Sequence, residues 1–199
     1  MSVTVILYHR AMSRWQPDAR GRLGQAAIDL YVERGFDQTT VADIAERAGL
    51  TERTFFRHFA DKREVLFAGQ DELLDQFVTA VKAAPETATP LEAVAAALHE
   101  VAVDFEPRRA WSEERGRVIA ANPGLQEREL IKLANMGNSI AAALRERGVS
   151  EPSASLAAQS GIAVFHVGFA QWIDPANTRK LSDLITEALE ALKVVAASD

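Results

Sequence analysis

Residues 40–59 read TVADIAERAGLTERTFFRHF and combine two short amphipathic helix patterns with a tight turn between them. Thr40 and Asp43 have the spacing of a capping box, which predicts that a helix begins just after Thr40. Gly49 predicts the end of that helix, because glycine adopts the left-handed conformation without a Cβ penalty. Thr51 is then a good N-cap for a second helix. The stretch therefore predicts a helix-turn-helix.

The second predicted helix separates apolar from polar side chains. Phe55 and Phe59 fall at i and i+4, so both can point towards a core. The other side is polar, and an α-helix fits the width of a DNA major groove. That side carries Glu52, Arg53, Thr54, Arg57 and His58. The pattern alone fits equally well an ordinary helical hairpin whose outer side meets only water, since amphipathic helix pairs are common.

The flanking sequence separates these two interpretations. Residues 20–81, about a third of the chain, resemble the DNA-binding domain of the TetR (tetracycline-repressor) family. The matching residues occur in order and at the same spacing. They are Arg34-Gly35-Phe36, Thr39-Thr40-Val41, Ile44-Ala45, Ala48-Gly49-Leu50, Thr54-Phe55-Phe56-Arg57-His58-Phe59, Lys62 and Leu66-Phe67. The resemblance implies a homodimeric, ligand-responsive transcriptional regulator, which we interpret as a repressor.

The resemblance also implies how DNA would be contacted, with the second helix of the pair in the major groove of a palindromic operator. The predicted base-reading residues are Glu52, Arg53, Thr54, Arg57 and His58. Arg53 and Arg57 are the best donors for guanine edges. The predicted phosphate contacts are Thr40, Thr51, Phe56 and Lys62. The family usually has tyrosine at the position of Phe56, and phenylalanine has no hydroxyl for a phosphate, so packing is the alternative role for Phe56.

Composition and charge fit this interpretation. The chain has 199 residues, of which 48% are hydrophobic and 25% charged, as in an ordinary globular protein. Its net charge is −6, but residues 10–63 carry ten Arg and Lys against eight Asp and Glu, a net +2 that leaves −8 for the rest. A mildly basic head on an acidic body supports a small DNA footprint. Cysteine is absent, which excludes disulfides and thiolate zinc sites.

The ends of the chain and its apolar stretches predict a cytoplasmic protein. The apolar run at residues 3–8 is short and no cationic region precedes it, so it is not read as a signal peptide. Residues 1–19 are predicted to be an N-terminal arm, of which residues 1–11 are interpreted as an annotation extension or a mobile tail. The longest apolar stretch, residues 156–173, is interrupted by polar residues and predicts a buried helix.

The rest of the chain predicts only helices, so the expected fold is all-α with about nine helices. Beside the helix-turn-helix pair, we predict helices at residues 20–34, 61–83, 91–105, 112–121, 125–147, 152–173 and 178–197. Pro85 and Pro90 bracket the segment PETATP, which predicts a linker. We therefore expect a helix-turn-helix DNA-binding domain at residues 20–84 and a helical effector-binding and dimerisation domain at residues 90–199.

The last two predicted helices are candidates for a dimer interface. The helix at residues 152–173 is apolar around most of its circumference, which requires cover on more than one side. TetR-like proteins dimerise through their last two helices as a four-helix bundle, and the resemblance implies the same here. A monomer with a fully internal helix is the alternative. The predicted interface residues are Leu156, Gly161, Val164, Val167, Gly168, Leu181, Leu184, Ile185, Leu189 and Leu192.

Enzyme signatures are absent from the sequence. His99-Glu100 begins like HExxH, but Val103 stands where the second histidine belongs, and Ser160-Gly161 lacks the first glycine of GxSxG. No GxGxxG or phosphate-binding P-loop occurs either. We therefore expect no enzymatic activity, no metal and no cofactor. The rival interpretation is a helical small-molecule-binding protein or enzyme that does not bind DNA.

An effector cavity lies among the middle helices of the second domain in this family. The candidate pocket residues here are Phe105, Trp111, Arg115, Asn135, Met136, Asn138, Phe165, His166, Phe169 and Trp172. Large flat surfaces with few polar groups favour a hydrophobic or aromatic effector over a sugar or a nucleotide. Plain core packing is the alternative for each residue, and Arg115 is interpreted as a surface cation.

Overall fold

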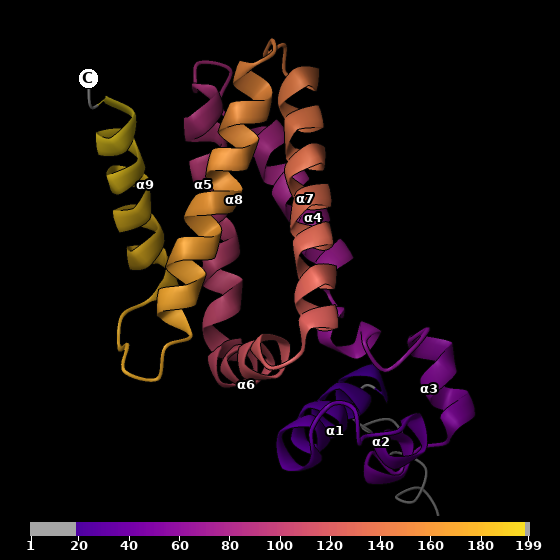
Figure 1. Cartoon of the computed structure of the whole chain (residues 1–199). Coiled ribbons are helices and arrows are strands. Elements are labelled where there is room, and N and C mark those ends of the chain that lie inside the picture. The colour runs from indigo at the N-terminus through magenta and orange to yellow at the C-terminus, as the bar shows by residue number, and fades with distance from the viewer. Residues whose placement is uncertain (1–18, 198–199) are drawn as a thin grey trace, which may run out of the picture. The chain divides into compact units, whose positions relative to one another are not determined.

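The computed structural model describes residues 19–197, in which every regular element is helical (Figure 1), so the all-α prediction is confirmed. The chain divides into two compact units, and the boundary lies between Leu66 and Phe67. The first contains α1 (Ala19–Arg34), α2 (Val41–Arg47) and α3 (Glu52–His58), and its end falls within the 3₁₀ turn η2 (Glu64–Phe67). The second contains α4 (Gln70–Ala83), α5 (Pro90–Phe105), η3 (Glu106–Arg108), α6 (Arg109–Ala120), α7 (Pro123–Glu146), α8 (Ser153–Trp172) and α9 (Leu181–Ala197). The predicted arm before α1 lies outside the described residues.

The first unit is built on the apolar stripe predicted for α1. Leu23, Ala26, Ala27, Leu30 and Tyr31 are all buried, as their helical spacing predicts. Gly35 ends α1 with a φ of 87° and Gly49 ends α2 with a φ of 64°, a conformation that favours glycine. The predicted caps at Thr40 and Thr51 are both present. The sequence pattern and the local structure therefore agree across the helix-turn-helix.

The predicted domain boundary in residues 85–90 is wrong, because α4 belongs to the second unit. Phe77 and Val81 on α4 are buried in the same core as α5 and α7. The segment from α4 to α5 is a turn within this unit. The Arg147 guanidinium donates hydrogen bonds to three backbone carbonyls there, at distances between 2.6 and 3.1 Å. The two prolines thus mark a turn over a shared core.

Two helices begin later than predicted. The helix expected from residue 61 is broken by Gly69, which adopts a φ of 85°, so that α4 starts at Gln70. The helix expected from residue 178 starts at Leu181, whose N–H donates to the Glu106 carboxylate over 2.7 Å. A side chain from η3 therefore caps α9, and sequence spacing gives no sign of a partner so distant in the chain.

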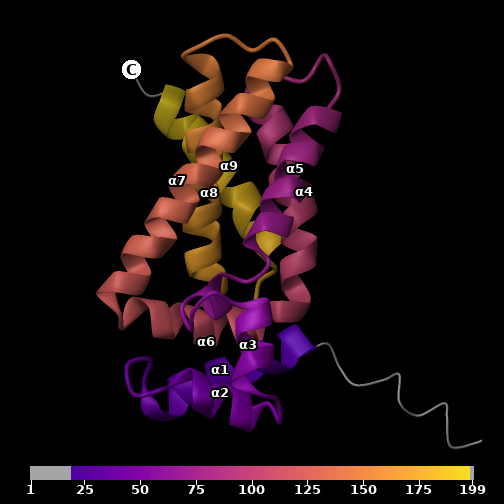
Figure 2. The ribbon, with the colours of Figure 1, turned by 90° about the vertical axis from the view of Figure 1, so that its right-hand side faces the viewer.

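The helix α8 lies at the centre of the second unit and packs on α5, α7 and α9 (Figures 1 and 2). Its glycines permit this within one chain. A Cβ at Gly161 would collide with the Val94 side chain of α5, and a Cβ at Gly168 would lie 3.4 Å from the Ile185 backbone nitrogen of α9. These two glycines thus admit neighbouring helices of the same chain.

Most of the predicted interface residues are buried in the core of one chain. They are Gly161, Val164, Gly168, Leu181, Leu184, Ile185 and Leu189. Leu192 is half-buried, while Leu156 and Val167 remain 63% and 48% exposed on α8. Within residues 19–197, no helix is long and apolar enough to cross a membrane.

Candidate nucleic-acid interface

Two phenylalanines fix the orientation of α3. Phe55 is fully buried and Phe59 is 5% exposed, and their ring centroids lie 5.4 Å apart. At the start of the helix, the Thr51 hydroxyl oxygen accepts a hydrogen bond from the Thr54 N–H over 3.2 Å. This cap satisfies one of the N–H groups that the first turn leaves without a partner. With one side held in the core, the opposite side of α3 must face outwards.

We call that opposite side the outer face of α3, and it contains all the residues predicted to read bases. Its members are Glu52, Arg53, Phe56 and Arg57, which are exposed, and Thr54 and His58, which are half-buried. A shallow hollow is lined by Arg53, Thr54, Phe56 and Arg57. Two guanidinium groups and an aromatic ring therefore share the exposed side of one helix. This arrangement can donate hydrogen bonds to base edges or phosphates and also offers an apolar contact.

Phe56 packs only against the surface of the core. Its side chain is 56% exposed, and its ring meets Phe55 only edge-on, with centroids 5.5 Å apart. It also has no hydroxyl with which to bond a phosphate. Phe56 is therefore an apolar group presented to whatever contacts the outer face of α3.

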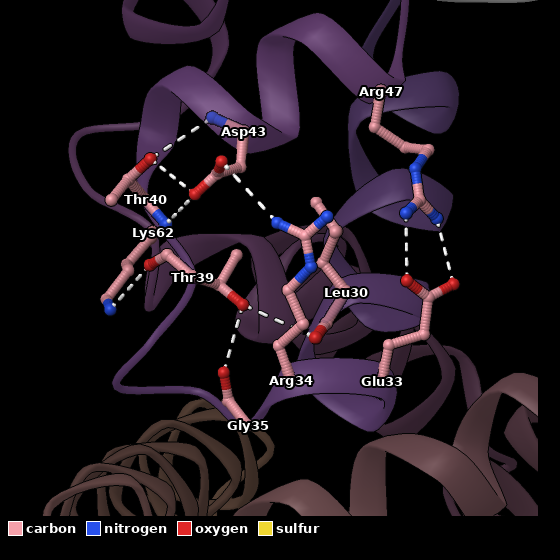
Figure 3. Close-up of polar contacts among 9 residues, drawn as sticks. All are labelled: Leu30, Glu33, Arg34, Gly35, Thr39, Thr40, Asp43, Arg47 and Lys62. Atoms are coloured by element: carbon pink, nitrogen blue, oxygen red, sulfur yellow. Dashed lines mark hydrogen bonds and ion pairs between the residues drawn. The ribbon is translucent and has the colours of Figure 1, made fainter.

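Ion pairs hold α2 against α1 (Figure 3). Arg47 and Glu33 form a two-pronged pair with N–O distances of 2.8 and 2.9 Å. The hydrogen bond from Arg47 lowers the pKa of the Glu33 carboxyl. A longer contact of 3.6 Å joins Arg34 to Asp43. A planar guanidinium that meets a carboxylate at two points fixes an angle as well as a distance, so these pairs help to set the position of α2.

Thr40 acts as the predicted cap, and this role competes with the predicted phosphate contact. Its hydroxyl donates to the Asp43 carboxylate over 2.6 Å and accepts from the Asp43 N–H over 3.1 Å. Two hydrogen bonds to the carboxylate, first the one from the Thr40 hydroxyl and then one from the Thr40 N–H over 2.8 Å, lower the pKa of Asp43. The only hydroxyl proton of Thr40 is therefore directed at Asp43.

Lys62 is a predicted phosphate contact, but its ammonium group binds backbone carbonyls of the protein itself. Its ammonium nitrogen lies 2.8 Å from the carbonyl oxygens of both Phe36 and Thr39, within its own domain. Sequence reasoning also missed Arg22, whose guanidinium donates to the Ala48 carbonyl at the end of α2. Both contacts join residues more than twenty positions apart in the chain, so no local sequence pattern predicts them.

In the second unit, four of the predicted pocket residues form one aromatic cluster, made of Phe105, Phe165, Phe169 and Trp172. Neighbouring ring centroids in it lie 5.3 to 6.2 Å apart. Phe105 and Phe169 are half-buried, whereas Trp172 is fully buried. The indole Nε1 of Trp172 has no hydrogen-bond partner among the described residues. A buried donor without an acceptor is uncommon and is a place where a bound polar atom would be stabilised.

The other predicted pocket residues differ in how far they are buried. Arg115 is only 8% exposed and pairs with Glu129 at 2.8 Å, so its interpretation as a surface cation is wrong. It also lies over the Phe67 ring, 5.2 Å from the centroid. Met136 is buried and Trp111 half-buried. The three remaining residues, Asn135, Asn138 and His166, are exposed.

Family models match both parts of the chain. Residues 24–68 match a model described as bacterial regulatory proteins of the tetR family. Residues 88–196, more than half of the chain, match a model described as the MftR C-terminal domain. The first match contains the whole helix-turn-helix, and the second contains the aromatic cluster together with α8 and nearly all of α9.

Curated relatives are similar over part of the chain. The transcriptional regulator TcmR of Streptomyces glaucescens is 37% identical over 82 residues, which are 41% of this chain and 36% of TcmR. The transcriptional repressor KstR2 of Mycobacterium tuberculosis is 40% identical over 78 residues, 37% of each chain. The activator FasR of Mycolicibacterium smegmatis is 33% identical over 72 residues, 36% of this chain and 33% of FasR. The chain thus spans about a third of the length of these relatives.

Solved structures share the fold over almost the whole chain. FadR of Thermus thermophilus, a TetR-family repressor in complex with lauroyl-CoA, has a TM-score of 0.53 and 23% identity, covering 87% of this chain and 93% of its own. SmeT in complex with triclosan has a TM-score of 0.62 and 19% identity, covering 89% and 90%. With both of its domains matched by family models and its helices arranged as in these structures, the chain belongs to the TetR family of bacterial regulatory proteins.

Proposed function

We propose that this protein is a homodimeric transcriptional regulator that binds a palindromic operator through α3 and is released by a small hydrophobic effector. The observation that carries the proposal is the outer face of α3. It presents Arg53, Arg57 and Glu52 to solvent, while Phe55 and Phe59 hold the helix in the core. A short, firmly held helix with bidentate donors on its exposed side is suited to the edges of base pairs in the major groove.

The base-reading roles follow from the chemistry of each side chain. Arg53 and Arg57 can each bond the two acceptors of a guanine, and Glu52 can accept from the amino group of a cytosine. Thr54 and His58 are half-buried and would contact a base only at close approach. Thr51 remains a candidate for a phosphate contact, because its hydroxyl lies at the exposed N-terminus of α3.

Two-fold pairing is proposed to occur through the outer face of α8, which consists of Leu156, Ala163, Val167 and Ala170, together with the exposed end of α9. These four residues are exposed and recur every three to seven positions on one side of the helix. On α9, Val194 and Val195 are 69% and 73% exposed. Such apolar groups on two adjacent helices support a self-complementary contact, in which each subunit offers the same surface.

The effector is proposed to bind beside the aromatic cluster. The partly exposed rings of Phe105 and Phe169 offer flat apolar surface, and the unsatisfied Nε1 of Trp172 offers one donor. This composition suits an apolar molecule that carries a hydrogen-bond acceptor. The effector would lower operator affinity to the extent that it binds one arrangement of the two reading helices more tightly than the other.

Repression is the simpler direction of control, because a dimer that occupies a promoter blocks it without any further contact. KstR2 and FadR are named repressors, whereas FasR is a named activator. A promoter fusion measured with and without the gene for this protein separates the two. Higher expression in its absence supports repression, and lower expression contradicts it.

A selection from random double-stranded DNA tests the proposed function. The purified protein should enrich an inverted repeat whose half-sites lie about one helical turn, ~34 Å, or a multiple of it apart. Enrichment of a single, non-repeated site would contradict the homodimer. Sequences recovered at random would contradict operator recognition altogether and would favour a helical small-molecule binder.

A further inference from the structure

One ammonium group joins the segment where the chain enters the helix-turn-helix to the segment where it leaves. Residues 35–39 lead from α1 into α2, and Lys62 follows α3. The Nζ of Lys62 lies 2.8 Å from the Phe36 carbonyl and 2.8 Å from the Thr39 carbonyl, with the Asp37 carbonyl at 3.4 Å. Figure 3 shows Lys62 reaching the segment at Thr39. The entrance and the exit of the motif are thus tied together.

The contacts of Lys62 match the hydrogen-bonding capacity of its ammonium group. An ammonium has three N–H donors and no acceptor, and three carbonyl oxygens surround this one. The ammonium also lies 4.4 Å from the centroid of the Phe36 ring, within cation–π distance. The side chain is only partly exposed. Moving this ammonium to a DNA phosphate would break contacts that already stabilise it.

Both of the tied segments are also anchored to α1. The Tyr31 hydroxyl donates to the backbone carbonyl of Lys62 over 2.6 Å. Thr39 is fully buried, and its hydroxyl lies 2.9 Å from the Gly35 carbonyl and 3.3 Å from the Leu30 carbonyl. The ammonium therefore closes a ring of contacts that runs from α1 through the entrance and the exit of the motif. This closure adds to the ion pairs that join α2 to α1.

We propose that Lys62 is a positioning residue for DNA reading and does not act as a phosphate ligand. This inference rests on the proposed operator binding. The Lys62 clamp, defined by the contacts of its Nζ with Phe36, Asp37 and Thr39, holds α2 and α3 in the arrangement that reads bases. Base contacts require accurate placement, whereas attraction to phosphates requires only charge. Loss of the clamp should therefore weaken specific binding far more than non-specific binding.

Lys62→Met removes the ammonium and keeps an apolar stem, and Lys82→Met is the matched control. Lys82 loses the same charge from the surface of the second unit, where it pairs with Glu146 at 2.7 Å. For each variant, the affinity for the selected operator and for a scrambled duplex is measured over a series of salt concentrations. We expect Lys62→Met to lose roughly tenfold in operator affinity, as for a lost hydrogen-bonded charge, with scrambled DNA bound as by Lys82→Met. The salt slopes of the two variants should agree.

A phosphate contact gives a different result. Operator and scrambled DNA would then lose affinity by the same factor. The slope of log K against log salt would also fall by about 1.8 for a dimer, since each phosphate contact contributes ~0.9. That pair of outcomes would overturn the positioning role.

A second measurement needs no DNA. Thermal unfolding of Lys62→Met, Phe36→Leu and the double variant forms a double-mutant cycle. The contact between the Lys62 ammonium and the Phe36 ring predicts that the two losses in melting temperature overlap, so that the melting temperature of the double variant falls by less than their sum. Additive losses would contradict that contact. A parent protein that prefers no DNA sequence would contradict the proposed operator binding instead, so the two failures are distinguishable.

Discussion

At the scale of single residues, Phe56 is a large apolar side chain that the structure exposes. It is 56% exposed on the outer face of α3, between Arg53 and Arg57 in the shallow hollow that they line. An apolar ring at this place has one specific partner in a major groove, the C5 methyl group of thymine. Phe56 would then read a base where a tyrosine hydroxyl would contact a phosphate.

Replacing thymine by uracil in the operator tests this role, because uracil lacks only that methyl group. Loss of one buried methyl contact is worth about 0.8 kcal/mol, so the parent should bind the uracil operator several-fold more weakly at the contacted position. Phe56→Ala should bind both operators with equal, reduced affinity. An alanine variant that still distinguishes thymine from uracil would contradict the contact.

A further prediction at this scale concerns acid. Hydrogen bonds lower the pKa of Glu33 and Asp43 below their usual values of 4.5 and 3.8. A carboxyl with a lowered folded-state pKa contributes stability above its unfolded value and loses it as the pH falls through the folded value. The melting temperature of the first unit should therefore be steady from neutral pH to about pH 5 and should drop below about pH 4. Asp43→Asn should have a lower melting temperature at pH 7, and this temperature should fall less steeply than that of the parent as the pH drops below about 4. An equally steep fall in parent and variant would contradict this role for Asp43.

At the scale of helices, the caps and ends of the helix-turn-helix were predictable from sequence, whereas packing partners were not. Thr40, Gly49 and Thr51 act within four residues of their own position, so their roles follow from local spacing. The apolar faces of α8 and α9 have the same period whether a face meets its own chain or another subunit. Periodicity therefore could not separate buried Leu189 from exposed Val167.

That distinction gives a paired prediction for the dimer. Val167→Glu places a charge on the outer face of α8, where the side chain is 48% exposed, so the subunit should fold normally but sediment as a monomer. Leu189→Glu places the same charge where the side chain is 5% exposed, which should destabilise the subunit itself by several kcal/mol. Sedimentation and thermal unfolding of both variants check this. A Val167→Glu protein that remains a dimer would exclude this face from the interface.

At the scale of the whole molecule, the division into two units was the least predictable feature. Residues 85–90 have the composition of a linker, yet α4 shares its core with α5 and α7. Proline and polar residues report a local turn, while a domain boundary depends on which distant residues pack together. The reading helix was predictable because it is a local motif. The Lys62 clamp and the burial of Arg115 were not, because their partners are remote in sequence.

The effector site also belongs to this scale, because it links ligand binding to operator release. Trp172→Phe removes the unsatisfied indole donor and keeps an aromatic ring. A ligand with an acceptor should raise the melting temperature of the parent, with ~2.7 kcal/mol expected at a hundred times its dissociation constant. The same ligand should stabilise Trp172→Phe less, while an acceptor-free analogue should affect both proteins alike. Equal stabilisation of parent and variant by the acceptor ligand would exclude the indole from the site.

The central claim, sequence-specific DNA binding through α3, is tested most directly by one titration. Fluorescence anisotropy with the DNA upstream of the protein's own gene is compared with a scrambled duplex of equal length, for the parent and for an Arg53→Ala, Arg57→Ala variant. The parent is predicted to prefer the upstream DNA by about a thousandfold or more, and the variant to lose most of this preference while keeping its helical circular dichroism. Equal binding of both duplexes by the parent, or an unchanged preference in the variant, would contradict the account.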